Sequence, residues 1–103
     1  MAALPCKITA QEFVAMDLIG RRFQSREGRS QLRGAVCGAA LHESFVTISV
    51  GSVQRQQGAA WNPLPDFDYK GSADTMSIWR AANGRVEIDI MNIGSIIIFP
   101  PGA

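Results

Sequence analysis

The sequence contains few of the side chains from which catalytic and metal centres are built. Its 103 residues include one histidine and two cysteines. A zinc site takes three or four ligands at paired spacings, which His42, Cys6 and Cys37 do not provide. We therefore expect no metal and no cofactor. No motif combines a nucleophile with a base and an orienting group, so the sequence predicts no catalytic residues and a protein that is not an enzyme.

The two cysteines also bear on the compartment. A chain of this length can build a core without disulfide bonds, which favours a reducing environment. Cys37 lies five positions before His42, a spacing that does not ensure contact between a thiol and a base. Since a free cysteine is more often a small buried apolar group than a nucleophile, we expect Cys37 to be buried.

Long apolar runs and a strong net charge are also absent. Residues 96–99 form a short apolar run, far below the roughly 20 residues that span a bilayer. Residues 1–10 lack the charged start and apolar stretch of a secretion signal. The formal net charge is +1, too small to indicate nucleic acid or an anionic membrane by itself. We expect a cytoplasmic protein without a membrane segment, in which any anion site is local.

What the sequence does contain is an ordinary globular composition. Hydrophobic residues make up 47% and charged residues 18%, a balance that supports folding rather than disorder. The length suits one domain with one core. Residues 1–103 are therefore expected to form a single domain.

Local patterns predict one helix near the start of the chain. Thr9 and Glu12 have the spacing of a capping box. Apolar residues then follow with helical spacing up to Gly20, a residue suited to a left-handed stop. The prediction is an amphipathic helix over about residues 10–19.

The remainder of the chain shows the alternation of strands. Val86, Ile88 and Ile90 alternate with acidic residues, and Asn83-Gly84 just before them is the pair preferred in a two-residue type I′ hairpin. The long stretch 54–72 has glycine and prolines and is interpreted as a loop. Strands are predicted at about 22–26, 30–38, 44–53, 75–80, 85–91 and 96–99.

Several of these segments resemble the Sm-like family, which includes Sm, Lsm and Hfq proteins. The likeness covers residues 18–23, 27–29, 32–36, 42–46 and 88–96. Its two signatures are the Arg33-Gly34-Ala35 step and the spacing of isoleucines around Asn92 near the end of the chain.

The resemblance implies a mainly β fold: a small, strongly bent, five-stranded antiparallel barrel of the Sm-like or SH3-like type, behind an N-terminal helix. Another small α+β domain is the alternative. The family also assembles into homo-oligomeric rings that bind RNA near a pore. The implied ring contact joins residues 46–50 of one copy to residues 96–99 of the next.

The family's RNA-binding positions are poorly matched. Its acidic, stacking and base-reading positions align with Ala40, His42 and Ser44, and only His42 keeps the chemistry. In the second signature Asp89 stands where the family has an arginine, which reverses the local charge. The remaining positions align with Ile90, Met91 and Asn92. The sequence therefore predicts RNA binding without base preference, and little effect of changing His42.

A cluster of arginines offers a second route to an anion. Arginine binds phosphate through two hydrogen bonds at once, and a hairpin near residues 27–28 gathers several arginines on one rim. The alternative is a solvated hairpin whose arginines pair with Asp66, Asp68 and Asp74. The candidate nucleic-acid-binding residues are Arg21, Arg22, Arg26, Arg29, Arg33, His42 and Asn92.

The long loop offers a different kind of site. Two carboxylates among aromatic residues can hold a cationic or aromatic ligand, although the aromatics can equally anchor the loop to the fold. The candidate ligand-binding residues are Trp61, Asp66, Phe67, Asp68 and Tyr69. The sequence thus leaves three functions open. The first is a non-catalytic, oligomeric module with weak RNA or polyanion binding. The others are a small-molecule-binding or enzymatic domain, and a structural or protein-interaction oligomer with a decayed RNA pocket.

Overall fold

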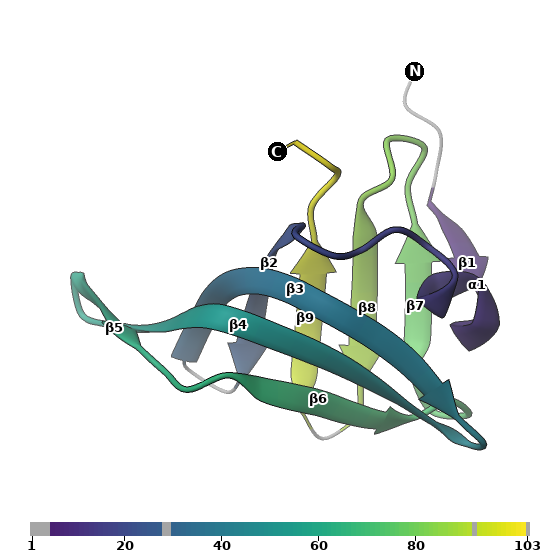
Figure 1. The fold of residues 1–103 in the computed structure, drawn as a ribbon, viewed down its shortest axis with the longest axis horizontal. Coiled ribbons are helices and arrows are strands. Elements are labelled where there is room, and N and C mark those ends of the chain that lie inside the picture. Colours follow the sequence, from purple (N-terminus) through teal and green to yellow (C-terminus); the bar gives the residue numbers. More distant parts are fainter. Residues whose placement is uncertain (1–4, 28–29, 92, 103) are drawn as a thin grey trace.

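The computed structural model of the chain describes residues 5–27, 30–91 and 93–102 (Figure 1). Within these residues the chain forms one short helix and nine strands. Their bounds are β1 Cys6–Ile8, α1 Ala10–Val14, β2 Arg22–Glu27, β3 Ser30–His42, β4 Phe45–Gln57, β5 Ala60–Pro63, β6 Phe67–Ser72, β7 Ser77–Arg80, β8 Val86–Ile90 and β9 Gly94–Ile98.

All nine strands belong to one antiparallel sheet. The strand order is β1-β7-β8-β9-β2-β3-β4-β5, and β6 pairs with another part of β4. The long strands β3 and β4 arch with β6 across the face of β9, β8 and β7 (Figure 1). The core lies between these two parts of the folded sheet and consists of Ile8, Phe13, Leu18, Phe23, Leu32, Val36, Val46, Ile48, Val50, Val53, Tyr69, Met76, Ile78, Val86, Ile88, Ile90, Ile96 and Ile98.

Two irregularities in the β3–β4 ladder accompany the bend. Between the pairs Arg33↔Gln54 and Ala35↔Gly51, β4 has one residue more than β3. Ser52, in this bulge, has a φ of 51°, a left-handed conformation that is uncommon for a residue other than glycine. A second shift leaves an extra residue, Cys37, on β3. Because bulges bend a strand and increase its twist, these two positions fold the sheet over its own core.

The predicted five-stranded barrel is wrong. The described sheet has nine strands and does not close, since its outer strands at the two ends do not pair with each other. Most of the difference lies in residues 54–72, where the loop prediction is also wrong. There β4 continues to Gln57, and β5 and β6 follow as two further strands on its edge. The mainly β character and the antiparallel pairing agree with the expectation.

The helix is shorter than predicted. Thr9 forms the expected capping box with Glu12, but α1 ends at Val14. The following residues turn toward β3, where the Gly20 amide donates to the Val36 carbonyl at 2.8 Å. These backbone groups bond to a strand instead of continuing the helical ladder, and Leu18 is buried in the core as a result.

The predicted hairpin between residues 75–80 and 85–91 is confirmed, with a different turn. The Gly84 amide donates to the Ala81 carbonyl and the Ala81 amide donates to the Arg85 carbonyl. Gly84 alone in this turn has a positive φ, of 90°. This is the pattern of a three-residue loop with a glycine bulge rather than a two-residue type I′ turn.

The strands predicted to join copies in a ring lie inside the sheet. Residues 46–50 of β4 pair with β3 on one side and β6 on the other. Strand β9 pairs with both β2 and β8. Neither segment has an open edge for a second copy, so the ring contact expected from them is wrong. No helix among the described residues is long and apolar enough to cross a membrane.

Candidate functional site

Three of the five candidate arginines lie on one face of the sheet. Side chains alternate along β2, so that Phe23 and Ser25 are buried while Arg22 and Arg26 are exposed. In the β2–β3 ladder Arg33 lies opposite Gln24, between the two exposed arginines. The outer face of β2, β3 and β4 therefore carries a cluster of cationic and amide side chains. We call this face, together with Trp61 of β5, the arginine face. It consists of Arg22, Gln24, Arg26, Arg33, Gln54 and Trp61.

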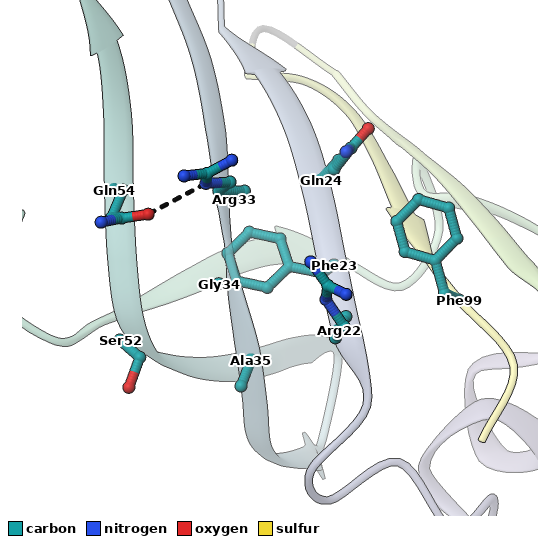
Figure 2. Close-up of a pocket in the computed structure, with 9 residues that line it drawn as sticks. All are labelled: Arg22, Phe23, Gln24, Arg33, Gly34, Ala35, Ser52, Gln54 and Phe99. Carbon is teal, nitrogen blue, oxygen red and sulfur yellow. Dashed lines mark hydrogen bonds between the residues drawn. The ribbon is translucent and has the colours of Figure 1, made fainter. Parts of the chain in front are cut away.

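Arg33 lies at the centre of this face and is held by two neighbours. Its Nε donates to Oε1 of Gln54 at 2.9 Å (Figure 2). Its guanidinium carbon lies 3.9 Å from the ring centroid of Trp61, a cation–π contact. Gln54 follows the bulge at Ser52, and Trp61 comes from β5, so both partners depend on the extension of β4 beyond the predicted strand.

A shallow hollow opens beside Arg33 (Figure 2). Its volume is about 500 Å³, and polar and apolar groups both line it. Phe99 stands at the β9 end, while Ser52 and Gln54 line the β4 end (Figure 2). Sequence reasoning missed Ser52, Gln54 and Phe99. Residues 54–57 are all polar, so no alternation of apolar and polar residues marked the continuation of this strand.

The arginine face carries unneutralised positive charge. Within the described residues the one ion pair is Arg85–Glu87, at 2.6 Å and on another part of the sheet. The described residues of β2, β3, β4 and β5 contribute no acidic side chain to this face. Asp66, which precedes β6, lies beside Gly51 and Cys37 and forms no ion pair with the described arginines. The alternative in which these arginines pair with Asp66, Asp68 and Asp74 therefore does not describe the structure.

Arg21 does not join the face. Arg21 precedes β2, and its Nη1 donates to the Gly84 carbonyl at 3.0 Å, which ties this segment to the β7–β8 turn. Its Nε is buried without a hydrogen-bond partner among the described groups. The predicted residue Arg29 lies outside the described residues.

The positions suggested by the Sm-like resemblance are not assembled into one site. His42 lies at the far end of β3, nine residues beyond Arg33 and so roughly 30 Å along the strand. Its ring stacks on Phe45 with a centroid distance of 5.0 Å, and its Nε2 lies 3.3 Å from the Thr47 hydroxyl. Asp89 belongs to β8, which does not neighbour β3. Asn92 lies outside the described residues.

The candidate ligand residues of 61–69 are divided between two faces. Trp61 packs over Arg33 on the arginine face. Tyr69 is buried on the opposite face, where its hydroxyl lies 2.6 Å from that of Ser25 and its ring contacts Phe23 and Phe67 edge to face. Asp66, Phe67, Asp68 and Tyr69 line a groove without Trp61. Phe67 and Tyr69 thus anchor their part of the segment to the core, as in the alternative considered from the sequence, and Trp61 does not.

The cysteines form no redox or metal centre with these groups. Cys6 and Cys37 are both free thiols and both exposed, so the expectation of a buried Cys37 is wrong. It is exposed because it is the extra residue of the second bulge, which breaks the inward alternation of β3. Among the residues with described positions, no group of three or more metal-ligating side chains is found.

Comparison with known proteins identifies no relative of this chain. No family model, no curated protein and no solved structure matches the chain.

Proposed function

We propose that this protein is a non-catalytic, cytoplasmic module that binds single-stranded RNA through the arginine face, without preference for base sequence. The observation that carries the proposal is the position of Arg22, Arg26 and Arg33 on one face, where the described side chains form no ion pair with them. Free thiols at Cys6 and Cys37 support a reducing compartment.

The side chains on the arginine face suit a single strand better than a simple anion. Arginine supplies charge and bidentate hydrogen bonds to phosphate. Gln24 and Gln54 add amide groups, and Trp61 adds a flat surface on which a base can stack. Base–aromatic stacking contributes about 1–3 kcal/mol per base and tolerates any base. A flexible single strand is able to use both kinds of contact at once.

The same chemistry explains the expected lack of sequence preference. Contacts to phosphate give affinity through counterion release and carry no base information. With three arginines engaged, the slope of log K against log salt is expected near −2, from about 0.7 counterions released per phosphate contact on a single strand. Binding should therefore weaken steeply as salt is raised.

The first test measures the fluorescence anisotropy of a labelled 12-nucleotide RNA at 25 mM and at 150 mM NaCl. Replacing Arg22 and Arg26 together by alanine should weaken binding at least tenfold and flatten the salt dependence. Arg80→Ala is the matched control, because Arg80 is also an exposed strand arginine but lies on β7. Equal affinities of the double variant and the control, or no binding at the lower salt, would refute the proposal.

A further comparison separates RNA from other polyanions. Trp61→Leu should weaken RNA binding about fivefold or more through lost stacking, while leaving the affinity for inorganic polyphosphate unchanged. If polyphosphate and RNA respond alike, the face binds polyanions in general.

His42→Ala should leave RNA affinity unchanged, since His42 contacts Phe45 and Thr47 rather than the arginine face.

A further inference from the structure

A second concave surface lies on the opposite, inner face of the sheet, beside β6. It is a groove of about 810 Å³ between β6 and the turn that joins β8 to β9. Its volume falls within the range of small-ligand sites. Leu32, Leu64, Phe67 and Ile93 provide apolar walls, and the charged residues Arg55, Asp66, Asp68 and Lys70 also line it. We call this surface the β6 groove.

The register of the strands determines which charged groups face the groove. Arg55 lies opposite Leu32 in the β3–β4 ladder, and Leu32 is a core residue. Since residues opposite each other in an antiparallel pair share a face, the side chain of Arg55 extends to the inner side of the sheet. Its Nε is buried and has no hydrogen-bond partner among the described groups.

The other charged residues along the groove direct their side chains elsewhere. Lys70 lies with its Nζ 4.2 Å from the ring centroid of Phe45 on the outer side. Asp68 is opposite Ser49 and alternates with the inward-facing Phe67 and Tyr69.

Asp66 turns to the outer side as well. A Cβ built on Gly51 would lie 3.2 Å from Asp66 Oδ1 and 3.1 Å from the sulfur of Cys37, so the carboxylate lies beside this outer thiol. Among the described side chains of β3, β4 and β6, Arg55 therefore carries the one charge on the inner face.

We propose that the β6 groove binds a small amphiphilic carboxylate, with its carboxylate on Arg55 and its apolar chain against Leu32, Leu64, Phe67 and Ile93. A guanidinium binds a carboxylate through paired, charge-assisted hydrogen bonds. A free inorganic anion would leave the apolar walls uncovered, and an uncharged lipid would leave the charge of the Arg55 guanidinium uncompensated. A ligand with one negative charge and one apolar body satisfies both.

The proposal is independent of RNA binding and is tested with decanoate below its micelle concentration. Isothermal titration should detect binding of decanoate, at least tenfold weaker binding of decanol, and none of decyltrimethylammonium. Arg55→Gln should lose at least tenfold in decanoate affinity. Arg80→Gln, the matched exposed arginine on β7, and the Arg22→Ala/Arg26→Ala variant should both retain it.

Nuclear magnetic resonance of the unaltered protein gives a second readout. Decanoate should shift the amide signals of residues 64, 66–69 and 93 and leave those of the arginine face in place. The proposal fails if no shift appears at these residues, if decanol binds as tightly as decanoate, or if Arg55→Gln binds decanoate like Arg80→Gln. If Arg55→Gln does not fold, as judged by circular dichroism, the three ligands on the unaltered chain decide the question.

Discussion

Gly34 lies in a part of the β3–β4 ladder that has no room for a side chain. A Cβ at this position would be 2.8 Å from the Gly51 carbonyl oxygen and 3.1 Å from the Cα of Val53, both backbone atoms. The ring of Phe23 lies 3.0 Å away on the core side. Because these atoms belong to the bulged ladder beneath Arg33, they cannot move without disturbing the arginine face.

Gly34→Ala should therefore destabilise the protein by about 1–3 kcal/mol, the usual cost of forcing an extra group into a packed core. Urea unfolding measures this change. Gly38→Ala is the matched control on the same strand, since its added Cβ meets nothing within 4 Å. It should be neutral or raise stability by about 0.4–1 kcal/mol through the unfolded state. Equal effects of the two substitutions would contradict the close approach at Gly34.

Residue identities in the arginine cluster could be predicted from the sequence, but their partners could not. The predicted hairpin brings Arg22, Arg26 and Arg33 together because side chains alternate between the two faces of a strand. Arg33 is opposite Gln24, and Arg22 and Arg26 lie two residues to either side of Gln24. The contacts of Arg33 with Gln54 and Trp61 depend on a bulge at Ser52 and on β5. Serine is not a residue type that indicates a bulge, so the contacts of Arg33 with Gln54 and Trp61 could not be predicted from the sequence.

At the scale of elements, alternation identified the strands that cover the core. Val86, Ile88 and Ile90 of β8 are buried as a period of two requires. Residues 54–57 at the end of β4 were missed because they extend past the core, where polar residues such as Gln56 and Gln57 occupy both faces and leave no periodic signal. Strand β5 is held by backbone pairing to these residues. Alternation of apolar and polar residues arises because one face of a strand is buried. It therefore does not reveal a strand that buries few side chains.

The interior position of β9 changes the expected effect of a proline at Ile97. In a strand paired on both sides, proline removes a ladder hydrogen bond, and the unpaired partner costs about 1–3 kcal/mol. Ile97→Pro should therefore lower the free energy of unfolding by at least this amount in a urea titration. Ile97→Val keeps the ladder and should cost less than about 1.5 kcal/mol.

Light scattering of the same two variants tests the ring contact directly. If Ile97→Pro left stability unchanged and instead reduced the mass of the folded protein, β9 would pair between copies and its place inside the sheet would be wrong.

The order of strands in the whole sheet depends on features that no short pattern records. Strand β1 pairs with β7 and β2 pairs with β9, so two ladders of the sheet join segments that are distant in sequence. Gly71 of β6 packs near Met76 and Ile90, since a Cβ on it would lie 2.7 Å and 3.0 Å from their side chains. Side chains thus fill the space between β6 and β8 while no described backbone ladder joins them.

An open sheet has a measurable consequence along β6. One edge of this strand is bonded to β4, and the other faces no described strand. Alternate amides along residues 67–72 should therefore be protected from hydrogen exchange and the intervening ones should exchange rapidly, because amides open to solvent have little opening free energy. Strand β9, paired on both sides, should be protected at successive amides. Exchange followed by nuclear magnetic resonance gives both patterns in one experiment. Uniform protection along β6 would mean that another strand, from this chain or a second copy, completes the sheet.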